Sequence, residues 1–314
     1  MTQLNLPENI SIAVLVPCYN EEAAIANVVH DFQTALPTAT IYVYDNNSTD
    51  KTVEVAKKAG AVVHTEILQG KGNVVRRMFA DIEADIFVMI DGDNTYDAAI
   101  APIMVQKLFD ENLDLLNGKR IHEDTEAYRP GHQFGNTLLT TLVAMIFGKR
   151  FEDMLSGYKI FSRRFTKSFP SLSSGFEIET ELTVHALELR MPVDEIETCY
   201  GARPEGSESK LSTFADGFKI LKMIGILIKE ERPLQLFSIL FGLFSLLAIV
   251  ISIPIISTYI DTGLVPRLPT AILAMGMMLL GFLCLACGLI LDTVTRGRQE
   301  FKRLQYLNVN RPQH

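Results

Sequence analysis

The first 116 residues alternate between short runs rich in β-branched residues and longer segments with helical spacing. The apolar runs are Ser11 to Val16, Thr40 to Tyr44, Ala61 to His64, Asp85 to Ile90 and Asp114 to Leu116. Segments such as Glu21 to Phe32 and Thr52 to Ala59 separate them. This alternation is typical of an α/β fold with a mostly parallel sheet. Ligands of such sheets bind beyond the carboxyl ends of the strands, so functional residues are expected there.

The pattern changes after the fifth run. Residues 122–133 are polar and predict a loop, and helices are expected at Phe134 to Phe147 and at Glu177 to Arg190. In residues 212–232 apolar positions recur at helical spacing with lysines along the flank. This pattern predicts an amphipathic helix in the membrane interface, and packing of the same apolar stripe against the sheet is the alternative.

Two long segments near the C-terminus carry no charge. Residues 233–260 and 268–291 contain 28 and 24 consecutive uncharged residues, and a bilayer core requires roughly 20. The link from Asp261 to Arg267 has seven residues. We therefore expect two transmembrane helices joined as a hairpin, preceded by one folded domain at 1–211 and followed by a basic tail at 293–314.

Charge divides the chain at the same place. From residue 233 onward there are six Lys or Arg and three Asp or Glu, so this part carries +3 and the first 232 residues carry −11. An acidic domain argues against nucleic-acid binding, which needs a basic surface. Basic residues flank the hairpin on both outer sides, while the short link holds Arg267. The positive-inside rule then predicts a multi-pass protein of the cell membrane with the folded domain and both termini in the cytoplasm.

Polar residues follow three of the predicted strands. The segments are Pro17-Cys-Tyr-Asn-Glu-Glu22, Asp45-Asn-Asn-Ser-Thr-Asp50 and Asp91-Gly-Asp93. Their positions at strand ends predict that acids and amides meet in one crevice. Asp91 and Asp93 flank a glycine, so both carboxylates can reach one hard divalent cation, although an isolated Asp-Gly-Asp is equally typical of a turn.

Two further segments suit anions. Gln69-Gly-Lys-Gly-Asn73 precedes a predicted helix and combines a mobile backbone with a cation, but its spacing is not that of a P-loop, and a plain helix cap is the alternative. The stretch from Arg203 to Lys210 can meet a phosphate at the membrane surface or serve as a linker. Asp153, taken alone, is also explained as a helix-end acid.

Six blocks together carry a resemblance to a known family. They are Pro17–Glu22, Asp45–Asp50, Gln69–Asn73, Asp91–Asp93, Asp153–Gly157 and Gly206–Leu211. In this order the chain resembles family 2 glycosyltransferases, and more closely the polyprenyl-phosphate hexosyltransferases, the group of dolichol-phosphate mannose synthase and the bactoprenol glucosyltransferases. The resemblance implies a GT-A fold, a nucleotide-sugar donor, a Mg²⁺ or Mn²⁺ ion and an inverting transfer onto a lipid phosphate.

The resemblance also implies roles by position. The donor-binding residues would be Pro17, Tyr19, Glu21, Asp45, Lys71, Asp91 and Gly92, with Asp91 and Asp93 as metal ligands. The acceptor phosphate would meet Arg120, assisted by Arg129, Arg203, Ser209 and Lys210. Asp153 matches the acid that acts as a base or orients the acceptor.

Two departures and three alternatives accompany this interpretation. Asp45-Asn46-Asn47 replaces the usual Asp-Asp-Gly, and the arginine expected directly before the Gly-x-Asn position at Gly135 is absent.

A processive polysaccharide synthase is disfavoured because the chain has no tryptophan. Another lipid or polysaccharide acceptor, and a non-catalytic nucleotide-sugar-binding membrane protein, stay open. UDP-glucose, UDP-N-acetylglucosamine and GDP-mannose all remain open as the donor. The sequence is also compatible with a homo-oligomer.

Overall fold

The computed structural model describes residues 4–122, 150–170, 177–201 and 229–310, together with 140–141, 143–144, 148, 175, 203, 222 and 225–226. The chain divides into two compact units. Met1–Ile220 and Lys302–His314 form the first, and Leu221–Phe301 form the second, which is therefore an insertion in the first. The loop predicted at 122–133, the helix at 134–147 and most of the interfacial helix at 212–232 lie outside the described residues.

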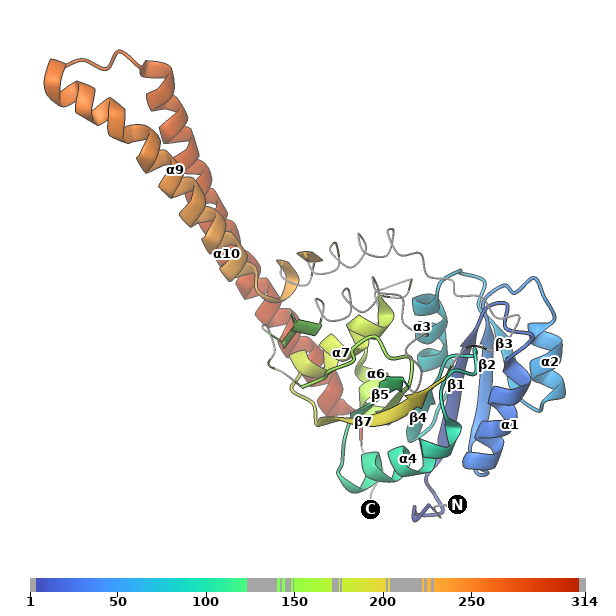
Figure 1. The fold of residues 1–314 in the computed structure, drawn as a ribbon. Helices are drawn as coiled ribbons and strands as arrows, with labels where there is room; N and C mark the ends of the chain where they lie inside the picture. Colours follow the sequence, from blue (N-terminus) through green and yellow to red (C-terminus); the bar gives the residue numbers. More distant parts are fainter. Residues whose placement is uncertain are drawn as a thin grey trace. The chain divides into compact units, whose positions relative to one another are not determined.

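Seven strands form one sheet in the order β3-β2-β1-β4-β6-β5-β7 (Figure 1). They are β1 (Ile12–Cys18), β2 (Thr40–Asp45), β3 (Val62–Thr65), β4 (Ile86–Met89), β5 (Leu115–His122), β6 (Lys159–Ser162) and β7 (Val193–Tyr200). Neighbouring strands pair in parallel except that β6 runs antiparallel between β4 and β5. The expected mostly parallel α/β fold is confirmed, and the carboxyl ends of β1, β2, β4, β5 and β7 lie at one edge.

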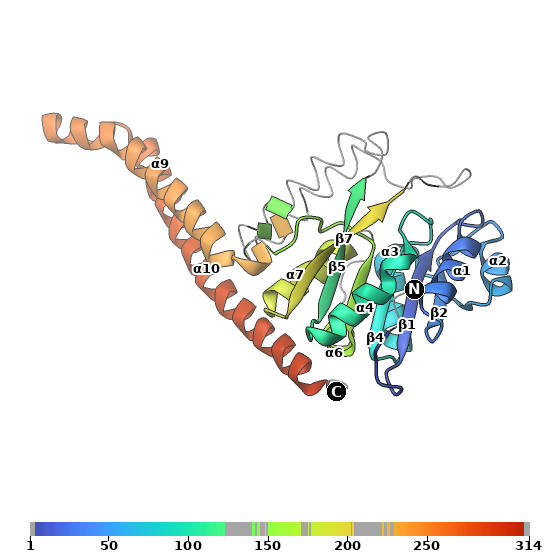
Figure 2. The ribbon, with the colours of Figure 1, turned by 60° about the horizontal axis from the view of Figure 1, so that its bottom comes forward.

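Helices cover both faces of this sheet (Figures 1 and 2). On one face lie α1 (Ile25–Ala35), α2 (Thr52–Lys58), the short 3₁₀ helix η1 (Ala98–Ile100) and α4 (Ala101–Asp110). On the other lie α3 (Lys71–Asp81), α6 (Arg163–Ser168) and α7 (Ile178–Glu188). Because both faces are covered, the central strands are apolar at consecutive positions, and Ile12 to Val16 are all buried.

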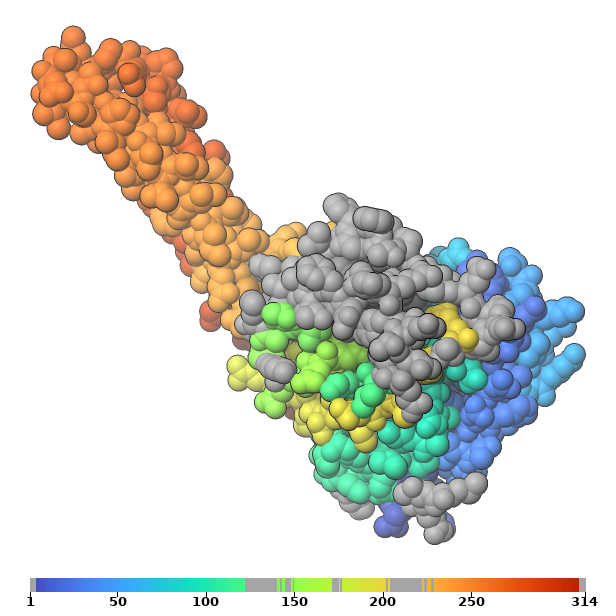
Figure 3. Space-filling model, viewed as in Figure 1, coloured from blue at the N-terminus to red at the C-terminus, as the bar shows by residue number. Residues whose placement is uncertain are grey.

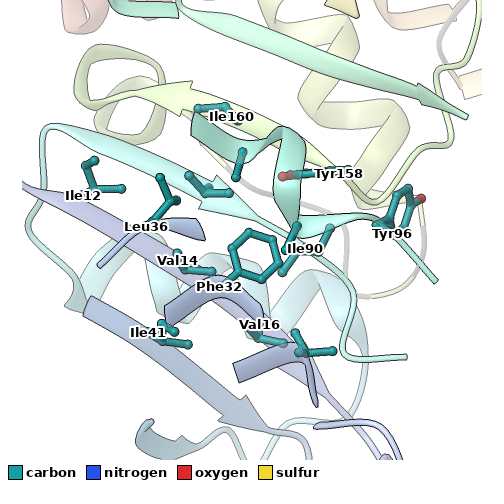
Figure 4. Close-up of a cluster of buried hydrophobic side chains, with 14 of the residues drawn as sticks. Ile12, Val14, Val16, Phe32, Leu36, Ile41, Ile90, Tyr96, Tyr158 and Ile160 are labelled. Carbon is teal, nitrogen blue, oxygen red and sulfur yellow. The ribbon is translucent and has the colours of Figure 1, made fainter. Parts of the chain in front are cut away.

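The core on the first face joins β1 to α1 (Figure 4). Val14 and Val16 point from β1 toward Phe32 of α1, and the Phe32 ring meets Tyr158 edge to face with centroids 6.2 Å apart. On the second face, Phe161 and Phe165 stack with centroids 4.7 Å apart. Such aromatic pairs bury large areas on either side of the sheet and fix how the helices lie over the strand ends.

The last turns of the final helix, α10 (Leu268–Asn308), belong to the first unit from Lys302 onward. Tyr306 is buried and donates a hydrogen bond of 2.7 Å to Asp114, a fully buried carboxylate at the start of β5. Arg164 donates to the Tyr306 hydroxyl over 3.0 Å, and Lys302 forms an ion pair of 2.5 Å with Glu188. The residues expected as a basic tail are thus helical to Asn308, and their end completes the globular unit.

The second unit consists mainly of α9 (Pro233–Thr262) and the preceding part of α10. Both helices are long and apolar enough to cross a membrane by length and composition. Large apolar side chains remain exposed along them, for example Ile239 at 71% and Ile260 at 76%. Figure 3 draws this part of the chain in orange to red. Gly263, with φ of +68°, ends α9 in the left-handed conformation that glycine adopts without steric cost.

Candidate functional site

Three strand ends bring together the residues expected to bind a donor. Pro17 is the second-last residue of β1 and Tyr19 follows the strand; both are half-buried, while Glu21 is buried. Asp45 ends β2, is buried and accepts a hydrogen bond from the Ser48 amide over 3.2 Å. These side chains therefore lie at the carboxyl edge of the sheet, as the parallel topology requires.

Each of the three turns contains an asparagine in the left-handed region. Asn20, Asn47 and Asn94 have φ of +53°, +63° and +56° and follow β1, β2 and β4. Asparagine tolerates this conformation better than most residues because its side chain bonds to nearby backbone groups. The side-chain oxygen of Asn20 accepts from the Thr49 backbone amide over 2.8 Å, and the backbone amide of Asn20 donates to the Ser48 hydroxyl over 2.9 Å. The first two turns are thus tied to each other.

Asn46 binds the loop that leads to Lys71. Its side-chain amide donates to the carbonyls of Glu66 and Leu68, both over 2.9 Å, and its oxygen accepts from the Gly70 amide over 2.6 Å. An aspartate could make the third bond but not the first two, because a carboxylate has no N–H donor. The departure from Asp-Asp-Gly at this position therefore has a structural role in this chain.

Lys71, at the start of α3, lies between two carboxylates. Its ammonium is 2.5 Å from Asp91 and 2.5 Å from Glu179 at the start of α7. Although burial lowers the pKa of Lys71, the charges of Asp91 and Glu179 raise it well above its usual value. Burial raises the pKa of Glu179 and the lysine opposes that shift. Glu179 was absent from the sequence-based site, since it belongs to none of the six blocks.

Asp93 is buried after β4 and pairs with Arg203 over 2.8 Å. Burial and the neighbouring charge of Asp91 raise the pKa of Asp93, while Thr95 and Arg203 oppose this shift. The described residues contain no group of three or more His, Cys, Asp or Glu side chains able to hold a metal ion. Two carboxylates nevertheless fit a hard cation that takes its other ligands from phosphates and water.

Glycines allow the close approach of the strand-end turns. A Cβ at Gly157 would lie within 2.9 Å of three atoms of the Asp91 carboxyl group, and a Cβ at Gly92 would lie 2.5 Å from the Cys18 sulfur. Any side chain at either position would displace a neighbour. Gly157, four residues after Asp153, is therefore packed directly against Asp91.

Arg120 and Asp153 form a two-pronged ion pair. The Arg120 Nε and Nη2 atoms donate to the two carboxylate oxygens of Asp153 over 2.7 and 2.8 Å, and the Arg120 amide adds a third bond of 3.2 Å. Burial raises the pKa of Asp153, but the hydrogen bonds and charge of Arg120 outweigh it and hold the pKa below its usual value. Asp153 is therefore ionised at neutral pH.

Tyrosines connect the Arg120 pair to the Asp91 side. The Gly157 amide donates to the Tyr96 hydroxyl over 2.8 Å, and the Tyr96 ring lies 5.0 Å from that of Tyr200. The Arg120 guanidinium lies over the Tyr200 ring, 5.4 Å from its centroid. The structure thus brings Asp91, Asp93, Lys71, Arg120, Asp153 and Arg203 to one edge, whereas Arg129, Ser209 and Lys210 lie outside the described residues.

Comparison with known proteins gives concordant results. The sequence profile described as "Glycosyl transferase family 2" matches residues 13–169. Glycosyltransferase AglJ of Haloferax volcanii is 35% identical over 238 residues, 74% of this chain and 77% of AglJ. Dolichyl-phosphate hexose transferase of the same organism is 27% identical over 221 residues, 70% of this chain and 95% of that protein.

A solved structure supports the fold. Glucosyl-3-phosphoglycerate synthase from Mycobacterium tuberculosis, crystallised with Mn²⁺, UDP and glucosyl-3-phosphoglycerate, superposes with a TM-score of 0.57 and 23% identity. The match covers 70% of this chain and 80% of the synthase. The expected GT-A architecture is confirmed by this likeness.

Proposed function

The chain belongs to glycosyl transferase family 2, and we propose that it transfers one hexose from a nucleotide sugar to a polyprenyl phosphate at the cytosolic face of a membrane. The observation that carries this proposal is the Arg120–Asp153 ion pair at the same edge of the sheet as Asp91, in a chain with two helices long enough to cross a bilayer. A similar protein named dolichyl-phosphate hexose transferase supports the acceptor class.

On the donor side, we propose that Pro17, Tyr19, Glu21 and Asp45 hold the nucleoside. Asp91 and Asp93 would hold Mg²⁺ or Mn²⁺, consistent with the Mn²⁺ and UDP of the structurally similar synthase. Such an ion neutralises the charge that develops on a departing nucleoside diphosphate. Lys71 provides a further cation beside Asp91 for the same diphosphate.

On the acceptor side, the guanidinium of Arg120 has the planar geometry that binds a phosphate through two parallel hydrogen bonds. The nucleophile is an oxygen of the lipid phosphate, which is ionised near neutral pH, so the site must mainly align it with the sugar and compensate its charge. Asp153 is itself ionised and held by Arg120, which favours a role in orienting the arginine. Arg129, Arg203, Ser209 and Lys210 are proposed as further acceptor contacts.

The test is transfer of labelled sugar by the purified full-length protein in lipid. UDP-glucose, UDP-N-acetylglucosamine and GDP-mannose are offered separately with undecaprenyl phosphate, with and without a chelator. We expect labelled lipid in the organic phase from one donor, and loss of that product with the chelator. No lipid product from any donor would refute the proposal; nucleotide-sugar binding without turnover would favour a non-catalytic role.

The proposed metal ligands are tested without measuring turnover. Binding of Mn²⁺ in the presence of UDP is followed by electron paramagnetic resonance in the wild type and in Asp93→Asn. Because the variant loses a ligand charge, its Mn²⁺ affinity should fall by about tenfold or more. Asp110→Asn, at an exposed position at the end of α4, serves as the matched control and should bind Mn²⁺ as the wild type does. Equal affinities for Asp93→Asn and the wild type would remove Asp93 from the ion site.

A further inference from the structure

Lys159 is a buried cation for which the proposed reaction has no direct use. It is the first residue of β6, between β4 and β5, and its side chain is fully buried. Its ammonium donates to the side-chain oxygen of Asn117 over 2.6 Å and to the carbonyl of Met154 over 3.2 Å. Both acceptors are neutral. Burying an ammonium is costly even when it makes two hydrogen bonds, which indicates a structural role for the contacts of Lys159.

Those two bonds lead to the turn that carries Asp153. Met154 follows Asp153 directly, so Lys159 fixes the carbonyl on one side of it. Asn117, whose oxygen accepts from Lys159, donates through its amide nitrogen to the carbonyl of Asp153 over 2.8 Å. The same nitrogen donates to the Glu195 carboxylate over 2.7 Å. Lys159 thereby orients an amide group that would otherwise be able to rotate.

Glu195, on β7, completes the support of this turn. Its carboxylate accepts from the backbone amides of Glu152 over 2.8 Å and Asp153 over 3.1 Å. The backbone on both sides of Asp153 is therefore held from β5, β6 and β7 together. Because Asp153 in turn forms three hydrogen bonds with Arg120, the orientation of the guanidinium depends on this turn.

We infer that Lys159 is a positioning residue for the acceptor, which holds the Asp153 turn through Asn117 and the Met154 carbonyl and so aligns Arg120 with the lipid phosphate. The inference rests on the proposed function and deepens it at the acceptor side. The hydrogen-bonded ion pairs of Lys71 on the donor side are made with Asp91 and Glu179 and do not include Lys159. Loss of Lys159 should therefore weaken acceptor binding while leaving donor binding largely unchanged.

The charge of Lys159 gives this inference a second signature. Burial lowers the pKa of Lys159 to about 8, against the opposing effect of the carboxylates of Asp153, Glu179 and Glu195, and Arg120 lowers it further. The folded protein thus loses the Lys159 proton as pH rises through about 8. A neutral amine is a weaker hydrogen-bond donor than an ammonium, so the bonds of Lys159 to Asn117 and Met154 should weaken as pH rises through 8. Binding of the lipid phosphate should weaken with them.

The experiment compares Lys159→Met with Ile160→Val in the full-length protein. Methionine keeps an unbranched side chain of similar length without the ammonium, and Ile160 is the next residue of β6, buried in the core cluster. We expect the KM for undecaprenyl phosphate to rise about tenfold or more in Lys159→Met, with the donor KM within twofold of wild type. Ile160→Val should lower thermal stability and leave both KM values unchanged.

Two further measurements keep the inference open to refutation. Glu195→Gln, at a half-buried position, should also raise the KM for undecaprenyl phosphate. This variant tests the inference if Lys159→Met does not fold. In the wild type the acceptor KM should increase above pH 8, and this increase should be missing in Lys159→Met. If the wild type transfers sugar but both variants keep its acceptor KM and pH profile, the inference is wrong while the proposed function stands. If the wild type transfers no sugar, the proposed function itself fails.

Discussion

Asn46→Asp is a nearly isosteric change whose effect follows directly from the hydrogen bonds of this side chain. The amide nitrogen of Asn46 donates to the carbonyls of Glu66 and Leu68, and both bonds are lost when it becomes an oxygen. Each such bond contributes about 1 kcal/mol to stability, and a buried carboxylate facing two carbonyl oxygens adds about 1–3 kcal/mol of desolvation and repulsion. We expect a total loss of about 3–5 kcal/mol, a large share of the stability of an ordinary domain.

The loss should have a characteristic pH dependence. Contact with two carbonyl oxygens raises the folded-state pKa of the introduced carboxyl above that of the unfolded chain, because protonation restores one donor. A group with a raised pKa contributes stability that is present below the unfolded pKa and lost as pH rises. The deficit of Asn46→Asp should therefore be largest at neutral pH and decrease as pH falls toward 4, without vanishing, because a protonated carboxyl restores one of the two lost donors.

The assay is urea denaturation of wild type, Asn46→Asp and a matched control, with donor affinity measured alongside. Asn47→Gly is the control, because Asn47 makes one exposed bond of 2.8 Å to Ile67 and glycine accepts its φ of +63°. The control should lose about 1 kcal/mol or less. Donor affinity should fall in Asn46→Asp, since the loop to Lys71 is no longer fixed. If the two variants lose equal stability at neutral pH, the proposed role of Asn46 is wrong.

Three further changes test other parts of the structure. Gly157→Ala places a methyl group against the Asp91 carboxylate and should reduce sugar transfer by about 100-fold with a wild-type circular dichroism spectrum, whereas unchanged transfer would contradict the packing of this turn. Tyr306→Phe removes the hydrogen bond to buried Asp114 and should cost about 1–3 kcal/mol in chemical denaturation; equal stability would contradict the assigned contact. Burial lowers the pKa of His185 to about 3, so the unfolded chain takes up this proton first as pH falls below 6.5. Stability should then decline by up to about 1.4 kcal/mol per pH unit, and a pH-stability curve of His185→Leu should lack this component.

The sequence predicted which polar residues lie together at the carboxyl edge of the sheet, because these residues end strands or follow them directly. Asp45 and Asp91 stand at the ends of apolar runs, and parallel topology places such ends together whatever the details of packing. The runs themselves correspond to β1 to β5. At these positions the local sequence pattern is enough to predict which residues meet in the folded protein.

The residues that hold the site residues in place could not be predicted from the local sequence pattern. Glu179 reaches Lys71 across 108 positions of sequence, and Glu195 on β7 accepts from the backbone amide of Asp153, which lies in the segment before β6. The sequence of β7 shows no clear alternation of apolar and polar residues, because β7 is an edge strand that carries Asp194, Glu195 and Glu197. Lys159 did leave a signal, because it is a charge within the otherwise apolar run from Tyr158 to Phe161.

The return of α10 to the globular unit determines how a water-soluble form of this protein can be made. Ending the chain before the apolar helices would also remove Lys302 and Tyr306, and Glu188 and Asp114 would lose these partners in the interior. Replacing residues 221–301 by a flexible linker keeps the closing turns of α10 with the domain that they complete. Simple truncation should therefore yield an aggregating product, whereas internal replacement should yield a folded one.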